Sequence, residues 1–215
     1  MSTTFFLVRH AIKAKAIGDV PITSIGVQQA QLTARYFHDF PITAIFSSPL
    51  RRAKETADYI ALETKSTINV NSRLRERANW GDLPGQTFDE FVAMWERCTC
   101  EPEYKPPVGD SAKQVGVRLS SLLTELAKKH PVHSNIVIVT HGGLITDFLV
   151  NTLPKNQLDV WHPNFVAVQS KLVPECSITT LIYESGKFKI TDFASVEHLK
   201  HHTANVNDTK TYKSI

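Results

Sequence analysis

Three short apolar runs each end at a polar or cationic group, and this arrangement constrains the fold more than any other feature of the chain. The runs are residues 5–8 (FFLV), 44–46 (AIF) and 136–139 (IVIV). None of them alternates apolar with polar residues, so each is typical of a strand covered on both faces, as in a parallel sheet between layers of helices. The sequence therefore predicts an α/β fold.

Amphipathic stretches lie between these runs. Apolar residues recur with the helical period in residues 26–37 and again in residues 111–129. Two capping boxes, Thr87 with Glu90 and Ser111 with Gln114, predict helix starts. The alternation of strands and helices predicts a three-layer sandwich with a mainly parallel central sheet and helices on both faces.

Turn and loop signals complete the predicted organisation. Residues 177–183 and 187–193 flank a turn at 184–186 and predict a hairpin, while proline-containing segments 100–110 and 153–164 predict loops. The chain becomes polar after Leu199. We expect one catalytic domain over residues 1–199 and a polar C-terminal tail over 200–215 with little fixed structure.

Composition narrows the classes of function. The formal net charge is +3, and the Lys and Arg residues are scattered, which argues against a nucleic-acid partner. No apolar run reaches the roughly 18 residues of a membrane span, and the first residues lack the features of a secretion signal.

The three cysteines, Cys98, Cys100 and Cys176, are an odd number, and the spacing of the first two is a weak metal signal. We expect unpaired thiols, no bound metal, no membrane association and a cytoplasmic location.

Each apolar run leads directly to groups that can hold an anion. Residues 5–8 lead to Arg9 and His10, and residues 136–139 lead to Thr140 and His141. Residues 44–46 lead to Ser48, a predicted N-cap, then to a helix expected to begin at Pro49 with Arg52 in its opening turn. Because the ends of parallel strands meet at one edge of a sheet, we expect four of these side chains to converge: Arg9, His10, Arg52 and His141.

Such a cluster suits a phosphoryl group. The arginine fork matches phosphate oxygens, and helix N-termini add backbone N–H groups. Taken singly, each residue has a simpler interpretation: Arg9 as a solvated or ion-paired residue at a strand end, and each histidine as a hydrogen-bonded core residue. The interpretation as a phosphoryl site depends on their convergence.

Seven sequence blocks follow one another over most of residues 5–199. They are RHA at 9–11, PITSIGVQQA at 21–30, SSPLRRAKETA at 47–57, LRER at 74–77 with the glycines that follow, GDS at 109–111, THGG at 140–143 and HL at 198–199. In content and order they resemble the blocks of the histidine phosphatase superfamily, in its phosphoglycerate mutase-like branch, with Arg9-His10-Ala11 resembling the family's RHG signature. The resemblance implies the family's α/β fold.

The resemblance also implies a role for each site residue. His10 corresponds to the phosphorylated nucleophile and Glu76 to the proton donor, while Arg9, Arg52 and a protonated His141 correspond to the phosphate pocket. The family pattern selects Arg52 rather than Arg51 as the phosphate ligand. From the residues alone, Glu76 is better explained as a surface ion pair with Arg75 or Arg77.

Two positions depart from the family pattern. Ala11 replaces the usual glycine beside the nucleophile, and Ala16 replaces an asparagine that helps bind phosphate. Both changes bear on the shape and strength of the pocket.

The expected activity is that of a phosphomonoesterase, a histidine acid phosphatase-type hydrolase, acting through phosphohistidine on a small phosphorylated substrate without metal or cofactor. Phosphoglycerate mutase-type transfer and a phospholigand sensor without turnover are the alternatives. The segment between Glu76 and His141 lacks paired arginines, which favours hydrolysis over transfer. Phe88, Phe91, Trp95 and the loop at 100–110 fit a lid over the pocket, although Phe91 and Trp95 are better explained as plain core. The C-terminal His198, His201 and His202 are expected to be solvated.

Overall fold

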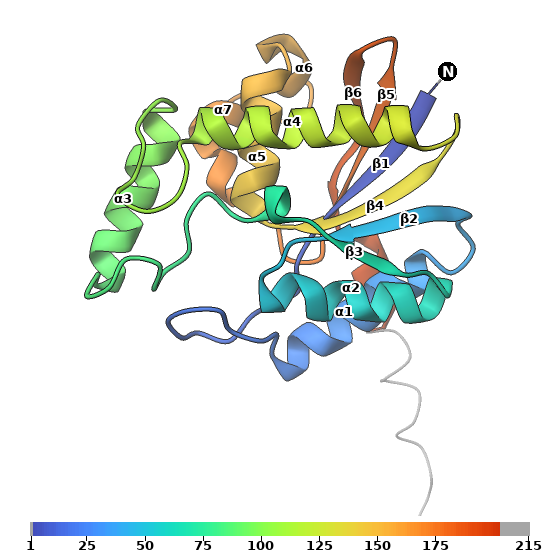
Figure 1. The fold of residues 1–215 in the computed structure, drawn as a ribbon, viewed down its shortest axis with the longest axis horizontal. Coiled ribbons are helices and arrows are strands. Elements are labelled where there is room, and N and C mark those ends of the chain that lie inside the picture. The colour runs from blue at the N-terminus through green and yellow to red at the C-terminus, as the bar shows by residue number, and fades with distance from the viewer. Residues whose placement is uncertain (1, 203–215) are drawn as a thin grey trace, which may run out of the picture.

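The computed structural model of the chain describes residues 2–202 (Figure 1). Its strands are β1 (Ser2–Arg9), β2 (Ile42–Ser47), β3 (Ile68–Val70), β4 (Asn135–Thr140), β5 (Ile178–Glu184) and β6 (Lys187–Ser195). Its α-helices are α1 (Ser24–Tyr36), α2 (Arg51–Thr64), α3 (Phe88–Cys100), α4 (Ala112–Lys129), α5 (Gly142–Thr152), α6 (Lys155–Asp159) and α7 (Phe165–Val168), and short 3-10 helices are η1 (Ser72–Leu74), η2 (Gln169–Lys171) and η3 (Glu197–His202).

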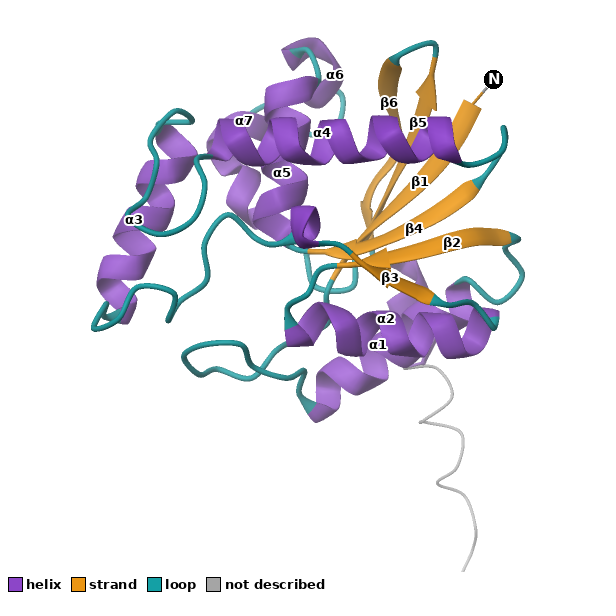
Figure 2. Ribbon diagram, viewed as in Figure 1, coloured by secondary structure: helices purple, strands orange, loops and turns teal. Residues whose placement is uncertain are grey.

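The strands form one sheet in the order β3-β2-β4-β1-β5-β6. β3, β2, β4 and β1 run parallel, while β5 and β6 form an antiparallel hairpin on the β1 edge. Helices cover both faces of the sheet (Figure 2). The predicted three-layer, mainly parallel α/β fold and the predicted hairpin are both confirmed.

Adjacent residues of the central strands face opposite layers, which explains why the apolar runs do not alternate. In β1, Phe5 and Leu7 pack with the apolar faces of α4 and α5, whereas Phe6 and Val8 pack with α1 and α2. β4 does the same with Ile136 and Val137. A strand buried on both faces has no solvent side on which polar residues would be stable.

The structure corrects some local predictions. The segment 153–164 is not all loop, because α6 and the preceding Pro154 form a short helix within it. Five residues are too few for a helical period to appear in the sequence. The three-residue edge strand β3 was likewise absent from the predictions, for the same reason of length.

Both capping boxes are confirmed, at the starts of α3 and α4. Figure 1 shows α3 standing away from the sheet, joined to the body through segments before and after it. Within residues 2–202 no helix has the length and hydrophobicity needed to cross a membrane.

The C-terminal prediction is only partly within the described residues. η3 extends to residue 202, beyond the expected domain end at 199, and residues 203–215 of the predicted tail lie outside the described part. His198 is not solvated as expected: it is half-buried and lies 3.1 Å from the Thr33 hydroxyl. The side chains of His201 and His202 are not described.

Candidate active site

The three central strands end level with one another. In the sheet register Arg9 lies beside Thr140, and Ser47 lies beside Val139. The pairing continues one residue further, since the His10 amide donates to the Thr140 carbonyl at 2.9 Å. The loops after β1, β2 and β4 therefore start at one edge of the sheet, as the sequence predicted.

His10 presents a free imidazole nitrogen toward the other site residues. The ring is 5% exposed, and Nδ1 lies 2.7 Å from the Ala11 carbonyl, which can only accept, so Nδ1 carries the proton. Nε2 then holds the lone pair and accepts a hydrogen bond from Arg52 Nε at 3.2 Å. Burial lowers the pKa of His10 well below its ordinary value, and the positive charge of Arg52 lowers it further. A neutral ring with Nε2 unprotonated is the form that can act as a nucleophile.

His141 meets His10 edge to face, with ring centroids 5.2 Å apart. Its side chain is fully buried behind His10, with Nε2 2.8 Å from the Ser48 hydroxyl; among the described residues, Nδ1 has no partner. Burial lowers the pKa of His141 well below its ordinary value, and the positive charge of Arg52 lowers it further. Both effects favour a neutral ring, and the expected protonation of His141 in the phosphoryl-bound site stays a prediction.

The helix after β2 starts later than predicted. α2 begins at Arg51 with Leu50 as N-cap, so the predictions of Ser48 as cap and of Pro49 as first residue are wrong. The Ser48 hydroxyl is instead beside His141, and the Asp19 carboxylate accepts from the Arg51 amide at 2.8 Å. An acid at the helix start stabilises the N–H groups that no capping side chain satisfies.

Arg52 points into the site and Arg51 points away. Arg52 is 3% exposed, and its Nη1 donates to the Asn79 side chain at 3.2 Å. Arg51 is exposed and pairs with Glu55 on its own helix. The choice between the two arginines, which the family pattern made, agrees with where the structure places them.

Arg9 forms an ion pair with a segment that is remote from it in sequence. It donates to the Val173 carbonyl at 2.5 Å and to the Glu175 carboxylate, and its buried Nε has no partner in the described part of the chain. Val173 and Glu175 belong to the segment that leads from η2 to β5. Two segments remote in sequence thus meet at Arg9.

Glu76 faces the same site from the segment after η1. Its Oε2 accepts from the Gly143 amide at 3.1 Å, and its Oε1 accepts from the Arg77 amide at 3.0 Å. A β-carbon at Gly143 would lie 2.8 Å from Oε1, so only glycine allows this approach. The surface ion pairs considered for Glu76 do not form, because Arg75 pairs with Asp82 and Arg77 with Asp147.

Comparison with known proteins agrees with this geometry. The family model of the histidine phosphatase superfamily (branch 1) matches residues 5–195. The chain belongs to the histidine phosphatase superfamily.

Individual relatives cover the chain to different extents. The phosphatase PhoE of Bacillus subtilis, described as uncharacterized, is 27% identical over 204 residues, which is 92% of this chain and 97% of that protein. The fructose-2,6-bisphosphatase TIGAR of Xenopus tropicalis is 33% identical over 115 residues, but the match spans 51% of this chain and only 42% of TIGAR.

Solved structures show the same fold. A phosphoserine phosphatase variant of Entamoeba histolytica in complex with phosphoserine is 25% identical, with a TM-score of 0.70 over 92% of this chain and 99% of that one. The YhfR structure of Bacillus stearothermophilus is 23% identical, with a TM-score of 0.73 over 92% of this chain and 100% of that one.

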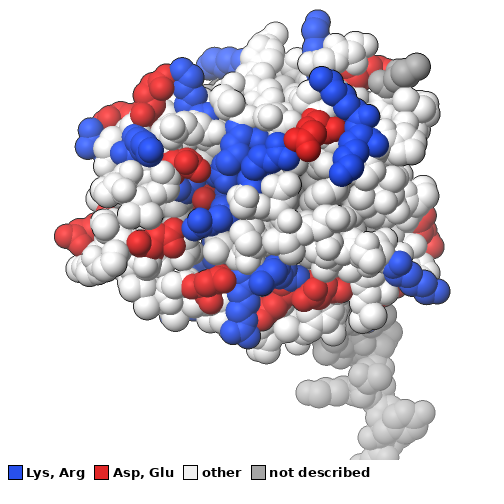
Figure 3. All heavy atoms as spheres, in the orientation of Figure 1, with Lys and Arg blue, Asp and Glu red and all other residues white. Residues whose placement is uncertain are grey.

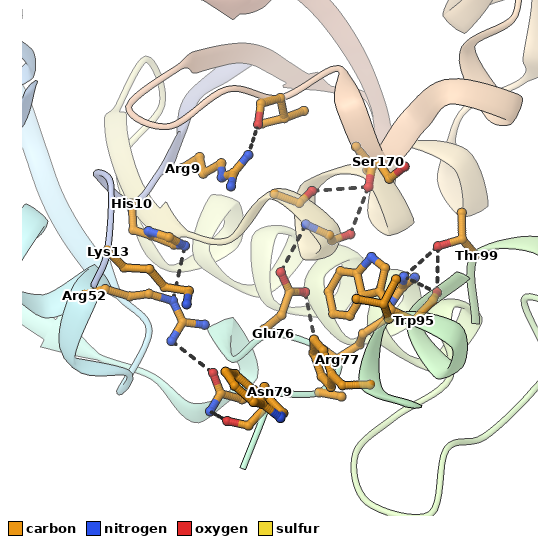
Figure 4. A pocket seen from close by; sticks show the side chains of 18 of the residues that line it. Arg9, His10, Lys13, Arg52, Glu76, Arg77, Asn79, Trp95, Thr99 and Ser170 are labelled. Carbon is orange, nitrogen blue, oxygen red and sulfur yellow. Dashed lines mark hydrogen bonds between the residues drawn. The ribbon is translucent and has the colours of Figure 1, made fainter. Parts of the chain in front are cut away.

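In this histidine phosphatase one cavity of about 470 Å³ joins the site residues. Arg9, His10, Arg52 and Glu76 all line it (Figure 4). His141 packs against His10 and is not among the lining residues. Four of the five predicted site residues therefore line the cavity, and the fifth, His141, packs against one of them.

Aromatic side chains form the opposite wall. Trp80 pairs edge to face with Phe88, with ring centroids 5.1 Å apart, and Phe91 lies 5.8 Å from Trp95. All four line the cavity, so the interpretation of Phe91 and Trp95 as plain core is wrong. The reason is that α3 stands off the sheet (Figure 1). Its Phe88, Phe91 and Trp95 side chains line the cavity instead of packing on the sheet.

Arg77 fixes this aromatic wall. Its guanidinium lies 3.8 Å from the centre of the Trp95 ring and donates to the Trp95 carbonyl and the Thr99 hydroxyl. It also pairs with Asp147 of α5 at 3.0 Å, both side chains being 2% exposed. Burial raises the pKa of Asp147 to about 7, although Arg77 opposes that shift. The pair connects α3 to the body of the domain.

Sequence reasoning missed several polar residues of the cavity, among them Lys13, Asn79 and Glu175. No spacing or period distinguishes Lys13 and Asn79 from other loop residues. Glu175 lies far from every motif and reaches the site only through the fold.

A second hollow lies on the other side of Glu76. Figure 3 shows Lys and Arg gathered near the middle of the face drawn, with acidic side chains beside them. Three arginines that line this hollow pair with carboxylates: Arg73 with Glu125, Arg75 with Asp82, and Arg118 with Asp110. Its charges are thus largely balanced within the protein.

Proposed function

We propose that this protein is a metal-independent phosphomonoesterase in which Nε2 of His10 becomes phosphorylated by a small phosphorylated substrate. The observation that carries the proposal is the shared cavity, in which the unprotonated Nε2 of His10 lies with two arginines and one carboxylate from three separate segments. Such a set has a nucleophile, cations for the phosphoryl oxygens and a group that can move a proton.

The first step transfers the phosphoryl group to the protein. The His10 lone pair attacks phosphorus, an N–P bond forms, and the P–O bond to the leaving alcohol breaks in line with it. Arg9 and Arg52 balance the charge on the remaining oxygens. Glu76 in its acid form gives its proton to the leaving oxygen, so the alcohol departs neutral.

The second step regenerates the protein. Glu76, now a carboxylate, takes a proton from water, and the water oxygen attacks phosphorus. The N–P bond breaks, inorganic phosphate leaves, and His10 returns to its neutral form with the lone pair on Nε2.

Buried His141 supports rather than contacts the reacting group in this proposal. Its ring packs against His10 and limits how far the nucleophile can turn. Arrival of a phosphoryl dianion favours a proton on any nearby imidazole, which opposes the lowered pKa of His141. The protonated form implied by the family resemblance would then belong to the substrate-bound state.

The replacement at position 11 is compatible with turnover. The Ala11 side chain is fully buried and packs with Ala30 and Cys176, away from the cavity. Ala16 does line the cavity and brings only a methyl group there. Of the two departures from the family pattern, only Ala16 changes a residue of the cavity, so it is the only one of the two that supports the sensor alternative.

The test is phosphate release from 4-nitrophenyl phosphate in the presence of EDTA. We expect turnover by the parent protein, none by H10A, and unchanged turnover by H38A, which removes an exposed histidine on another face. Activity that survives in H10A would refute the nucleophile, and loss of activity with EDTA would refute metal independence.

The same preparation separates the alternatives. With 3-phosphoglycerate, phosphate release without formation of the 2-isomer supports hydrolysis, whereas isomer exchange supports a mutase. Tight phosphate binding with no turnover of any ester would support a sensor.

We also propose a reducing, cytoplasmic location. Cys98, Cys100 and Cys176 are all free thiols in the structure, two of them buried. An odd set of free thiols is typical of a reducing compartment.

A further inference from the structure

Lys13 lines the cavity beside His10 and Arg52, although no motif includes it (Figure 4). It lies in the loop from β1 to α1, three residues after the nucleophile. Its side chain is half-buried, and its backbone pairs with Ile22 in an isolated antiparallel bridge. Lys13 is therefore part of the cavity wall and not a solvated loop residue.

The backbone on either side of Lys13 is fixed. The Ile12 amide donates to the Gln29 side chain at 3.0 Å, and the Ile12 carbonyl accepts from the Thr23 amide at 2.8 Å. Gly26 passes so closely that a β-carbon there would lie 2.3 Å from the Ile12 carbonyl oxygen. These contacts fix the backbone position from which the Lys13 side chain extends along the cavity.

The hydrogen-bond donors of Lys13 are less occupied than those of the other cavity cations. Arg9 donates to Val173 and Glu175, and Arg52 donates to His10 and Asn79. For the ammonium group of Lys13, the one recorded partner within residues 2–202 is the Ala14 carbonyl, at 3.5 Å, which is too long for a strong hydrogen bond. Lys13 thus has donors available for a ligand.

The charges around Lys13 favour an anion. Burial lowers the pKa of Lys13, and the positive charges of Arg52 and Arg9 lower it further, with Glu175 opposing. That carboxylate is already paired with Arg9. Arg77, a fourth lining cation, is paired with Asp147. Lys13, Arg9 and Arg52 thus repel one another, and a bound dianion would relieve that repulsion.

We propose that Lys13 binds the oxygens of the phosphoryl group and stabilises the charge that they carry during transfer. The inference rests on the proposed function, and it assigns to Lys13 the donor role for which the Ala16 methyl group, on the same wall, is unsuited. A flexible ammonium can follow the phosphoryl group as it moves from the leaving oxygen to His10.

The experiment compares K13M, K13R and K15M with the parent protein. Methionine keeps most of the side-chain length without charge, and Lys15 is an exposed lysine two residues along the same loop. Binding of inorganic phosphate is measured by calorimetry, and kcat/KM is measured with 4-nitrophenyl phosphate. Thermal unfolding of each variant checks that the fold is retained.

We expect K13M to weaken phosphate binding by about 10- to 100-fold, the effect of losing one charged hydrogen bond. kcat/KM should fall at least as much, K13R should restore most of both, and K15M should change neither. Phosphate binding by K13M equal to that of a binding-competent parent would overturn the role of Lys13 alone. A parent that neither binds phosphate nor hydrolyses the ester would overturn the proposed function itself.

Discussion

Nε of Arg52 lies 3.2 Å from Nε2 of His10 and donates a hydrogen bond to it. The nitrogen assigned as nucleophile is thus held in its unprotonated form by a cation that comes from the next strand end. The same contact places the guanidinium where phosphoryl oxygens would lie during attack, so Arg52 adds to the effect of burial on the His10 pKa and also contributes positive charge to the site.

Removing that arginine should change both properties. In R52M we expect kcat/KM to fall by roughly 10²- to 10³-fold, as for loss of one donor to a developing oxyanion. The pKa of His10 should rise relative to the parent, because a positive charge that lowers it is gone while burial remains. Steady-state kinetics and NMR titration of the imidazole measure the two effects.

R51M is the matched control, since Arg51 is the exposed neighbour on the same helix turn. It should leave the pKa of His10 and kcat/KM unchanged. Equal effects of R51M and R52M would contradict the placement of Arg52.

Substitution of Glu76 should separate the two chemical steps. In E76Q we expect hydrolysis of an alkyl phosphate to fall by roughly 10²- to 10⁴-fold, because its leaving oxygen needs a proton. With 4-nitrophenyl phosphate, whose leaving group needs no proton, E76Q should give a rapid burst of nitrophenol followed by slow turnover. Stopped-flow absorbance measures this burst.

E96Q serves as the control for Glu76, because Glu96 is an exposed carboxylate that lines the same cavity. Normal rates in E96Q and equal losses for both esters in E76Q would together argue that Glu76 shapes the cavity without moving a proton.

The buried pair between Arg77 and Asp147 should be costly to break. D147N leaves the Arg77 charge buried without its carboxylate, for which we expect a loss of about 3–5 kcal/mol in the free energy of unfolding. The double variant R77M/D147L removes both charges and should be more stable than D147N. Urea unfolding at a pH at least one unit above the Asp147 pKa of about 7, where the carboxylate is ionised, measures all three proteins.

E125Q provides the comparison for D147N. Glu125 pairs with Arg73 at the surface, where such a pair contributes at most about 1 kcal/mol. A D147N variant no less stable than E125Q would show that the buried pair does not hold α3 to the body.

The buried histidines should contribute a loss of stability as the pH is lowered, whereas Asp147, whose pKa is raised to about 7, contributes in the opposite direction. Burial lowers the pKa of His10 and His141 well below the ordinary 6.5, and lowers that of His198 to about 4. Below pH 6.5 the unfolded chain binds protons that the folded rings do not, so the contribution of these rings to the free energy of unfolding decreases down to each folded pKa. The slope for one such histidine is roughly 1 kcal/mol per pH unit.

The H198Q variant tests the contribution of a buried histidine to the pH dependence of stability, at a position away from the active site. Urea unfolding between pH 7 and pH 5, a range of about two units set by these pKa directions, should show a shallower decrease for H198Q than for the parent. H38Q, at an exposed histidine, should keep the parent slope. A slope in H198Q identical to that of the parent would contradict the lowered pKa of His198.

The sequence determined the layers and the strand ends. Residues 5–8 and 136–139 could only be strands covered on both faces, because a continuous apolar run has no polar side for water. Parallel pairing then brings Arg9, His10, Arg52 and the strand end before His141 to one edge, whatever the details of the loops.

Only the tertiary structure decided which residues surround the phosphoryl site and in what form. Lys13, Asn79 and Glu175 reach the cavity through loop paths that no period encodes. The lowered pKa of His141 follows first from its burial, which depends on the packing of whole elements. Local patterns fix elements because they depend on neighbours in the chain, whereas burial and charge at a site depend on residues far apart in it.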